Sequence, residues 1–124
     1  MINVDTRSNA LIIDDEIDIC YLLKSILRYK NIEADYVTSL QEAHRVLQGT
    51  DPQIIFLDNH LSDGLGVQNI RRIKKSHPDS VIIMITAHDT ATDRQLAYQE
   101  GVDYFISKPF TREIILQTMD KVCL

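Results

Sequence analysis

Polar side chains with complementary chemistry follow four short apolar segments of this chain. They are a pair of carboxylates, a third carboxylate, a hydroxyl and an amine: Asp14 and Asp15, Asp58, Thr86, and Lys108. Carboxylates that lie close together repel one another unless a proton or a divalent cation neutralises them. Oxygen ligands at a shallow site suit Mg²⁺, which keeps several of its waters when bound. These residues therefore predict a magnesium site, provided that the fold brings them together.

The same residues suit the transfer of a phosphoryl group onto a carboxylate. An aspartate can act as the nucleophile, while a metal ion and a lysine stabilise the charge spread over the phosphoryl oxygens. Lys108 supplies a compact positive charge, and the Thr86 hydroxyl can donate a hydrogen bond to one of these oxygens. Asp58 is the favoured phosphoacceptor because it is central, whereas Asp14 and Asp15 are adjacent and suit a metal-binding pair.

These side chains meet only if the segments before them are parallel strands of one sheet. Ile54–Leu57 and Val81–Ile85 are continuous apolar runs, which is typical of strands covered by helices on both faces. The carboxyl ends of parallel strands lie at one edge of the sheet, where α/β proteins bind their ligands. The five strands that we expect are Leu11–Ile13, Ile32–Val37, Ile54–Asp58, Val81–Ile85 and Tyr104–Ile106.

Five helical segments alternate with these strands. One face of the first segment, which ends near residue 30, is formed by Ile19, Leu22, Leu23, Ile26 and Leu27. The other helices are expected from the cap at Ser39 to Gly49, from about Leu65 to His77, from Asp89 or Thr90 to Gly101, and from the cap at Thr111 to Val122. This alternation predicts an α/β fold with a single doubly wound five-stranded parallel sheet in a three-layer sandwich.

The composition is that of one globular domain, and it argues against some classes of function. The 124 residues carry 13 basic and 18 acidic side chains, and the net charge of −5 argues against nucleic acid binding. No signal-peptide pattern or membrane-spanning apolar run is present, so we expect a cytoplasmic protein without a membrane partner. Cys20 and Cys123 lack metal-type spacing and are expected to be reduced thiols. Residues 1–8 are interpreted as a lead-in and residues 9–124 as the domain.

Four motifs, taken in their order and spacing, resemble the receiver domain of two-component response regulators such as the chemotaxis regulators: Asp14-Asp15, Asp58, Thr86 and Lys108-Pro109-Phe110. The resemblance covers about residues 8 to 123. It implies a flavodoxin-like sheet with the strand order 2-1-3-4-5. It also implies that Asp58 accepts a phosphoryl group from a histidine kinase or a phosphotransfer protein.

The resemblance further implies a set of metal ligands. Mg²⁺ would be bound directly by Asp15, Asp58 and the backbone carbonyl of His60, and mainly through water by Asp14. Many receivers have Met-Pro at the positions of residues 61–62, where this chain has Leu-Ser. Without the proline, the loop that carries the metal-binding carbonyl is expected to be less rigid.

A switch pair is implied as well. Thr86 would move toward the phosphoryl group, and Phe105 would fill the space that Thr86 vacates. The peptide bond before Pro109 is expected to be cis, which is uncommon for such bonds. His60 and His88 occupy variable positions beside the site and would modulate the lifetime of the phosphoryl group.

The implied partners are an effector domain or target protein, and a second copy of the domain through residues 89–123 when phosphorylated. A role in transcription regulation is a further expectation, and the domain would catalyse only its own phosphorylation and dephosphorylation. The alternative is a Mg²⁺-dependent phosphohydrolase with an aspartyl-phosphate intermediate. Enzymes of that kind typically have an Asp-x-Asp motif after the first strand, whereas Asp58 follows the third expected strand. A flavin carrier would need a Ser/Thr/Gly-rich phosphate loop after the first strand. Residues 14–16 at that position are acidic and would repel a phosphate.

Simpler readings exist for single residues. The acidic residues 14–16 are also favourable at the start of a helix, because they interact with its dipole. Phe105 alone is equally typical of a packed core. His60 and His88 together fall short of the three or four nitrogen or sulfur ligands that a zinc site needs.

Overall fold

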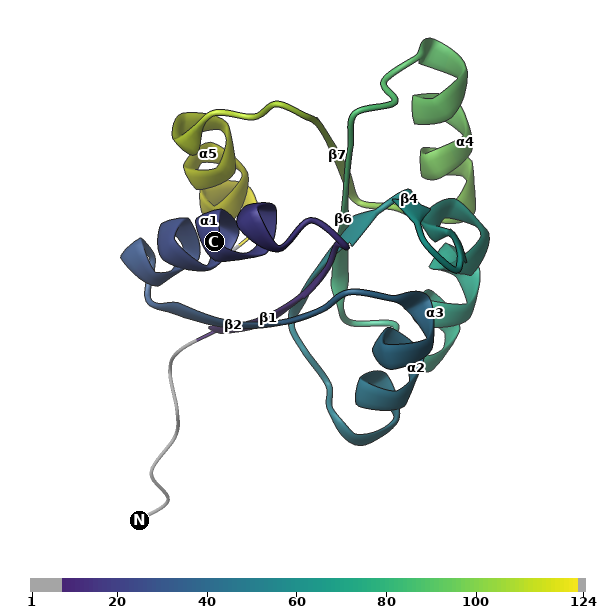
Figure 1. The fold of residues 1–124 in the computed structure, drawn as a ribbon, viewed down its shortest axis with the longest axis horizontal. Coiled ribbons are helices and arrows are strands. Elements are labelled where there is room, and N and C mark those ends of the chain that lie inside the picture. The colour runs from purple at the N-terminus through teal and green to yellow at the C-terminus, as the bar shows by residue number, and fades with distance from the viewer. Residues whose placement is uncertain (1–7, 123–124) are drawn as a thin grey trace.

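The computed structural model describes residues 8–122, which fold around one five-stranded parallel sheet (Figure 1). Its strands are β1 (Ser8–Ile13), β2 (Ile32–Val37), β3 (Ile54–Asp58), β6 (Val81–Thr86) and β7 (Tyr104–Ser107). They lie in the order β2-β1-β3-β6-β7, so the expected order 2-1-3-4-5 of the five sheet strands is confirmed. The polar strand β2 is at one edge of the sheet.

Five helices cover the two faces of the sheet, as the doubly wound topology requires. Helices α1 (Ile17–Tyr29) and α5 (Arg112–Val122) lie on one face. Helices α2 (Leu40–Gly49), α3 (Ile70–Ser76) and α4 (Ala91–Glu100) lie on the other. None of the helices within residues 8–122 is long and apolar enough to cross a membrane.

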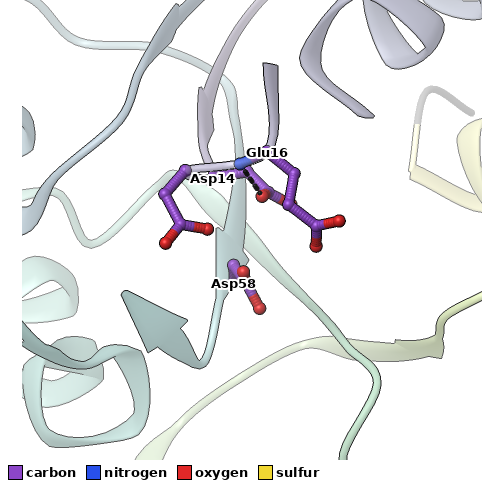
Figure 2. Close-up of side chains that lie close together, drawn as sticks. Asp14, Glu16 and Asp58 are labelled. Atoms are coloured by element: carbon purple, nitrogen blue, oxygen red, sulfur yellow. Dashed lines mark hydrogen bonds between the residues drawn. The ribbon is translucent and has the colours of Figure 1, made fainter. Parts of the chain in front are cut away.

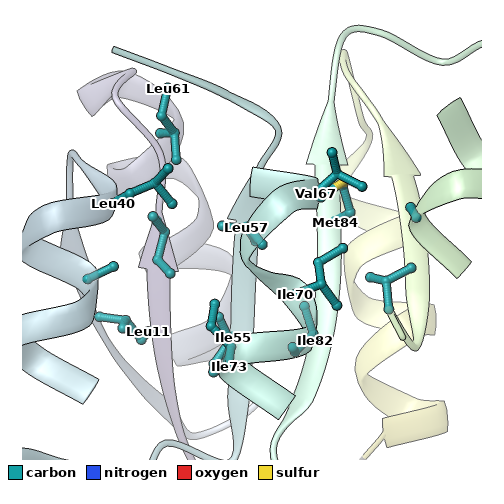
Figure 3. Packing of buried hydrophobic residues seen from close by; sticks show 14 of the residues in the cluster. Leu11, Leu40, Ile55, Leu57, Leu61, Val67, Ile70, Ile73, Ile82 and Met84 are labelled. Carbon is teal, nitrogen blue, oxygen red and sulfur yellow. The ribbon is translucent and has the colours of Figure 1, made fainter. Parts of the chain in front are cut away.

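Strand β3 supplies the centre of both hydrophobic cores, because all five of its residues are buried. Ile55 and Leu57 pack toward α2 and α3, and Figure 3 shows Leu40 and Ile70 of these helices turned toward the same layer. Ile54 and Phe56 instead join the core beneath α1 and α5, since successive strand side chains point to opposite faces. Full burial of one such side chain contributes about 1.5–3 kcal/mol relative to exposure.

Helix starts follow the predicted caps. The hydroxyl of Ser39 accepts a hydrogen bond from the amide of Glu42 at 3.1 Å, and the Glu42 carboxylate accepts one from the Thr38 hydroxyl at 3.0 Å. Thr90 caps α4 at 3.0 Å, and Thr111 accepts from an α5 amide at 3.2 Å. These three helices therefore begin where the sequence predicts.

Other boundaries and faces differ from the sequence prediction. Strand β1 begins at Ser8 and so includes a residue that we assigned to the lead-in; the rest of that lead-in lies outside the described residues. On α1, Leu22 is 45% exposed, although it was predicted to face inward, and Cys20 is buried in its place. The buried stripe of α1 runs through positions 20, 23, 26 and 27, which leaves position 22 beside it.

The segment after β3 was predicted to become helical near Leu65, but it forms a small hairpin first. Strands β4 (His60–Leu61) and β5 (Gly64–Leu65) pair antiparallel, and a 3₁₀ turn over Gly66–Asn69 precedes α3. The helical spacing of the inward Ile70 and Ile73 therefore predicts α3, but not the hairpin and the 3₁₀ turn before it. The helix ends at Ser76, before His77-Pro78, as predicted.

Candidate functional site

Four carboxylates converge at the carboxyl edge of the sheet. Asp58 is the last residue of β3, and Asp14 directly follows Ile13, which pairs with Leu57 in the neighbouring strand. Both carboxylates are buried, whereas Asp15 and the following Glu16 are exposed. Ligand oxygens of Asp14, Asp15, Glu16 and Asp58 all lie within 4.8 Å of one another.

Figure 2 shows how two segments build this cluster. Asp58 projects from the end of β3, while Asp14 and Glu16 come from the turn between β1 and α1. The backbone amide of Glu16 donates to Asp14 Oδ1 at 2.9 Å, which fixes the orientation of the Asp14 carboxylate. The thiol of Cys20, buried in the first turn of α1, donates to the Asp14 backbone carbonyl at 3.3 Å.

Lys108 reaches into the cluster from the loop after β7. Its Nζ lies 2.8 Å from Asp14 Oδ2, 2.8 Å from Glu16 Oε1 and 3.3 Å from Asp58 Oδ2. Its backbone amide donates to the Thr86 carbonyl at 2.8 Å, which ties the loop to the end of β6. The bond from Lys108 to Pro109 is cis, as expected.

Burial and charge perturb the protonation of this cluster. Burial, with a further contribution from the negative charge of Asp14, raises the pKa of Asp58 to about 6, although Lys108 acts in the opposite direction. Burial also opposes the charge of Lys108, but its hydrogen bonds to Asp14 and Glu16 and the charge of Asp58 outweigh that effect. The pKa of Lys108 therefore lies above its ordinary value.

A divalent cation fits this donor set. Four carboxylates surround one amine, so the ionised cluster keeps an excess of negative charge that one lysine cannot neutralise. All of the candidate side-chain ligands are hard oxygen donors, which Mg²⁺ prefers. Asp15 is exposed and has an oxygen in the cluster, which leaves it accessible to an ion.

Glu16 belongs to this cluster, and the sequence reasoning missed it. It was interpreted only as an acidic residue near a helix start, which it also is, because it is the N-cap of α1. Its ion pair with Lys108 joins residues 92 positions apart, at the same edge of the sheet where Asp14 meets Lys108. The only signal in the sequence was its place beside the Asp14-Asp15 pair.

The loop after Asp58 is held by three contacts that the sequence did not reveal. The side chain of the buried Asn59 accepts a hydrogen bond from the Val67 amide at 2.9 Å. Asp63 accepts from two amides at the start of α2, at 2.9 and 3.0 Å, and these bonds, that from Leu40 above all, lower its pKa. A Cβ at Gly66 would lie 2.4 Å from the backbone oxygen of Asp58.

These contacts bear on the departure at residues 61–62. We expected the Leu-Ser sequence, which replaces Met-Pro, to leave the loop less rigid. The β4–β5 pairing, and the two hydrogen bonds that α2 amides donate to the Asp63 carboxylate, connect this loop to the rest of the domain without a proline.

Thr86 and Phe105 lie at one small cavity beside the cluster. Thr86 is buried, and its Oγ1 accepts a hydrogen bond from the His88 amide at 3.1 Å. Phe105 is 8% exposed and lines the same cavity of about 170 Å³. The imidazoles of His60 and His88 also line this cavity, with ring centroids 3.8 Å apart and ring planes tilted by 33°.

Comparison with known proteins identifies this arrangement. A family model described as the response regulator receiver domain matches residues 10–120. The chain belongs to this family. The transcriptional regulatory protein SrrA of Staphylococcus aureus is 34% identical over 111 residues, which cover 89% of this chain and 46% of SrrA. The transcriptional regulatory protein TrcR of Mycobacterium tuberculosis is 30% identical over 104 residues, covering 84% and 40% of the two chains.

Solved receiver domains share the fold. A two-component response regulator from Clostridium difficile superposes with a TM-score of 0.90 at 27% identity, covering 94% of this chain and 96% of that one. The beryllofluoride-activated NtrC4 receiver domain dimer superposes at 0.87 and 34% identity, with coverages of 92% and 94%. A response regulator from Burkholderia pseudomallei, solved with a phosphorylated aspartic acid and a calcium ion, matches at 0.82 and 25%, with coverages of 88% and 64%.

The receiver domain is a signalling domain that takes part in two-component phospho-aspartate signalling. This chain spans less than half the length of the curated relatives described above. Their names report transcription regulation, in keeping with the role expected from the sequence, and the acidic cluster of this chain is compatible with Mg²⁺ binding.

Proposed function

We propose that this receiver domain is a Mg²⁺-dependent switch that is phosphorylated on Asp58. The observation that carries the proposal is the contact of the buried Asp58 carboxylate with Lys108 inside a cluster of four carboxylates. An anion buried at the end of a strand is costly unless it meets a cation. Asp58 combines this burial with access to both a lysine and a metal-type donor set.

In the proposed reaction, an Asp58 oxygen attacks the phosphorus of a phosphohistidine on a kinase or a phosphotransfer protein. The new O–P bond forms as the P–N bond breaks, and the imidazole leaves with the electron pair and takes up a proton. Lys108 stabilises the charge on the phosphoryl oxygens, and the Thr86 hydroxyl donates to one of them. When bound, Mg²⁺ neutralises carboxylate charge and polarises the transferring group.

The carboxylates of Asp14 and Asp15 have different proposed roles. Asp15, with Asp58 and the His60 backbone carbonyl, would hold the ion directly. Asp14 is buried against Lys108 and would act mainly through water. Asp15→Asn should therefore weaken Mg²⁺ binding more than Asp14→Asn, and equal losses in a calorimetric titration would contradict this division.

Helix α4 is the proposed origin of the output signal. Ala97 is its only buried residue, and weak packing goes with easier displacement. It follows Thr86 in sequence and precedes Phe105, the two residues of the proposed switch. An effector domain, a target protein or a second copy of this cytoplasmic domain would then bind through residues 89–123.

Amide exchange with and without beryllofluoride tests this output face. The largest changes are expected in α4, β7 and α5, and small ones in α1. Changes confined to α1, with residues 89–107 unaffected, would rule the face out.

Reductive trapping with borohydride tests the phosphoacceptor itself. The domain is incubated with Mg²⁺ and acetyl phosphate, and the reagent then converts an aspartyl phosphate to homoserine. We expect peptide mass spectrometry to find homoserine at position 58. Homoserine at another position would refute the assignment. Rapid multiple-turnover phosphate release with little trapped homoserine would favour a phosphohydrolase whose aspartyl-phosphate intermediate does not accumulate.

A further inference from the structure

Arg94 joins the loop that follows Thr86 to the strand that carries Phe105. Its Nε lies 2.5 Å from Asp89 Oδ1, and its Nη2 lies 3.2 Å from Asp89 Oδ2 and 3.3 Å from Ser107 Oγ. The Ser107 hydroxyl also donates to Asp89. These three residues, called here the Arg94 bridge, connect the start of α4, the loop before it and the end of β7.

The same guanidinium covers the ring of Phe105. The Arg94 guanidinium carbon lies 4.8 Å from the centroid of this ring, which is within the range of a cation–π contact. Phe105 packs in the core beneath α2, α3 and α4, so Arg94 contacts the ring in its buried position. Because Asp89 holds the guanidinium with two hydrogen bonds, this position of Arg94 is well defined.

Few side chains of α4 are buried. Leu96 and Tyr98 are exposed by 43% and 47%, and Ala97 is the only buried residue of the helix. The opposite end of α4 has its own ion pair, in which Arg71 Nη2 lies 3.0 Å from Glu100. That second pair is also an arginine–carboxylate pair, with the Arg71 side chain 72% exposed against 44% for Arg94, and it links α4 to α3. Arg71 therefore serves as the control for loss of an α4 ion pair at the other end of the helix.

We propose that the Arg94 bridge holds Phe105 in its buried position and thereby favours the phosphorylated conformation. The inference rests on the proposed function, in which Phe105 fills the space beside Thr86 when Asp58 carries a phosphoryl group. Stabilising one conformation raises the affinity of any ligand that binds this conformation preferentially. Arg94 acts through Asp89, Ser107 and Phe105 and not on the reacting groups, so it is a positioning residue.

Fluorine NMR tests the bridge without any ligand. The chain has three phenylalanines, so labelling with fluorophenylalanine gives a small set of signals, and Phe105→Leu identifies that of Phe105. Arg94→Met keeps an apolar side chain of similar length but removes the charge. It is expected to move the Phe105 signal toward the position of a solvent-exposed ring, whereas Arg71→Met leaves the signal unchanged. An unchanged Phe105 signal in Arg94→Met would overturn the proposal.

Beryllofluoride affinity in the presence of Mg²⁺ provides the second measurement. Arg94→Met should weaken binding roughly two- to fivefold, as expected for loss of an exposed cation–π contact. Asp89→Asn should act in the same direction, and Arg71→Met should bind like the wild type. Unchanged or tighter binding by Arg94→Met would refute the role of the bridge. Failure of the wild type to bind beryllofluoride would instead contradict the proposed function, and the fluorine signal would still decide the inference.

Discussion

Replacing Asp58 with asparagine should stabilise the metal-free domain at neutral pH. Burial and the Asp14 charge raise the pKa of Asp58 from 3.8 to about 6 in the folded chain. A pKa difference of about two corresponds to about 3 kcal/mol of unfavourable free energy for the ionised carboxylate. Asparagine has a similar shape but carries no charge, and Lys108 keeps its contacts with Asp14 and Glu16 in the variant.

The pH dependence of this difference has a definite sign. Between pH 3.8 and 6 the folded chain binds more protons at Asp58 than the unfolded chain does, so wild-type stability falls as the pH rises through this window. The advantage of Asp58→Asn should therefore grow by up to about 3 kcal/mol over this window and stay constant above it. Asp79→Asn, which removes a carboxylate at an exposed loop position, is the matched control.

Urea unfolding followed by circular dichroism, in EDTA from pH 4 to 8, measures both effects. Addition of Mg²⁺ should then stabilise the wild type more than Asp58→Asn, because a ligand that binds only the folded state adds to its stability. If the stability of wild type and of Asp58→Asn changed with pH in parallel, Asp58 would not be a carboxylate whose pKa is raised by folding.

Three further changes test other parts of the site. Gly66→Ala should destabilise the domain by about 1–3 kcal/mol in urea unfolding, because its Cβ would collide with the backbone oxygen of Asp58; wild-type stability would contradict the close approach. Asp63→Ala should lower the urea midpoint at pH 7, because it removes the acceptor of two amides at the start of α2. The difference from wild type should shrink as the pH falls through the lowered pKa of Asp63, and a constant difference would count against a stabilising role of these two hydrogen bonds. His60→Ala combined with His88→Ala should change the dephosphorylation rate at pH 7, because both imidazoles line the cavity beside Thr86; a wild-type rate in the double variant would make the histidines bystanders.

The sequence predicted the fold well because its strongest patterns are local. The apolar runs before Asp58 and Thr86 could only be buried strands, and the caps at Ser39 and Thr111 could be read from adjacent residues. Parallel strand ends lie at one edge, so the convergence of Asp58 with Lys108 followed from topology. The hairpin after β3 was missed because Leu65 fits a helical spacing that the short β4–β5 pairing overrides.

Particular side-chain contacts between residues far apart in the chain were not predicted. The pairing of Glu16 with Lys108, whose side chain is only 9% exposed, depends on where the last loop passes. The same holds for Arg94 and Ser107, which lie in different elements. Gly66 requires close approach to the Asp58 backbone, and one sequence gives no sign of this distance.

The central claim is that Asp58 accepts the phosphoryl group in a Mg²⁺-dependent reaction. Intact-mass measurement after incubation with acetyl phosphate tests it most directly, with wild type and Asp58→Asn each assayed in Mg²⁺ and in EDTA. The account predicts that only the wild type in Mg²⁺ gains the mass of one phosphoryl group, and that this gain is lost under acid. An equal gain in Asp58→Asn, or no gain in the wild type, would contradict it.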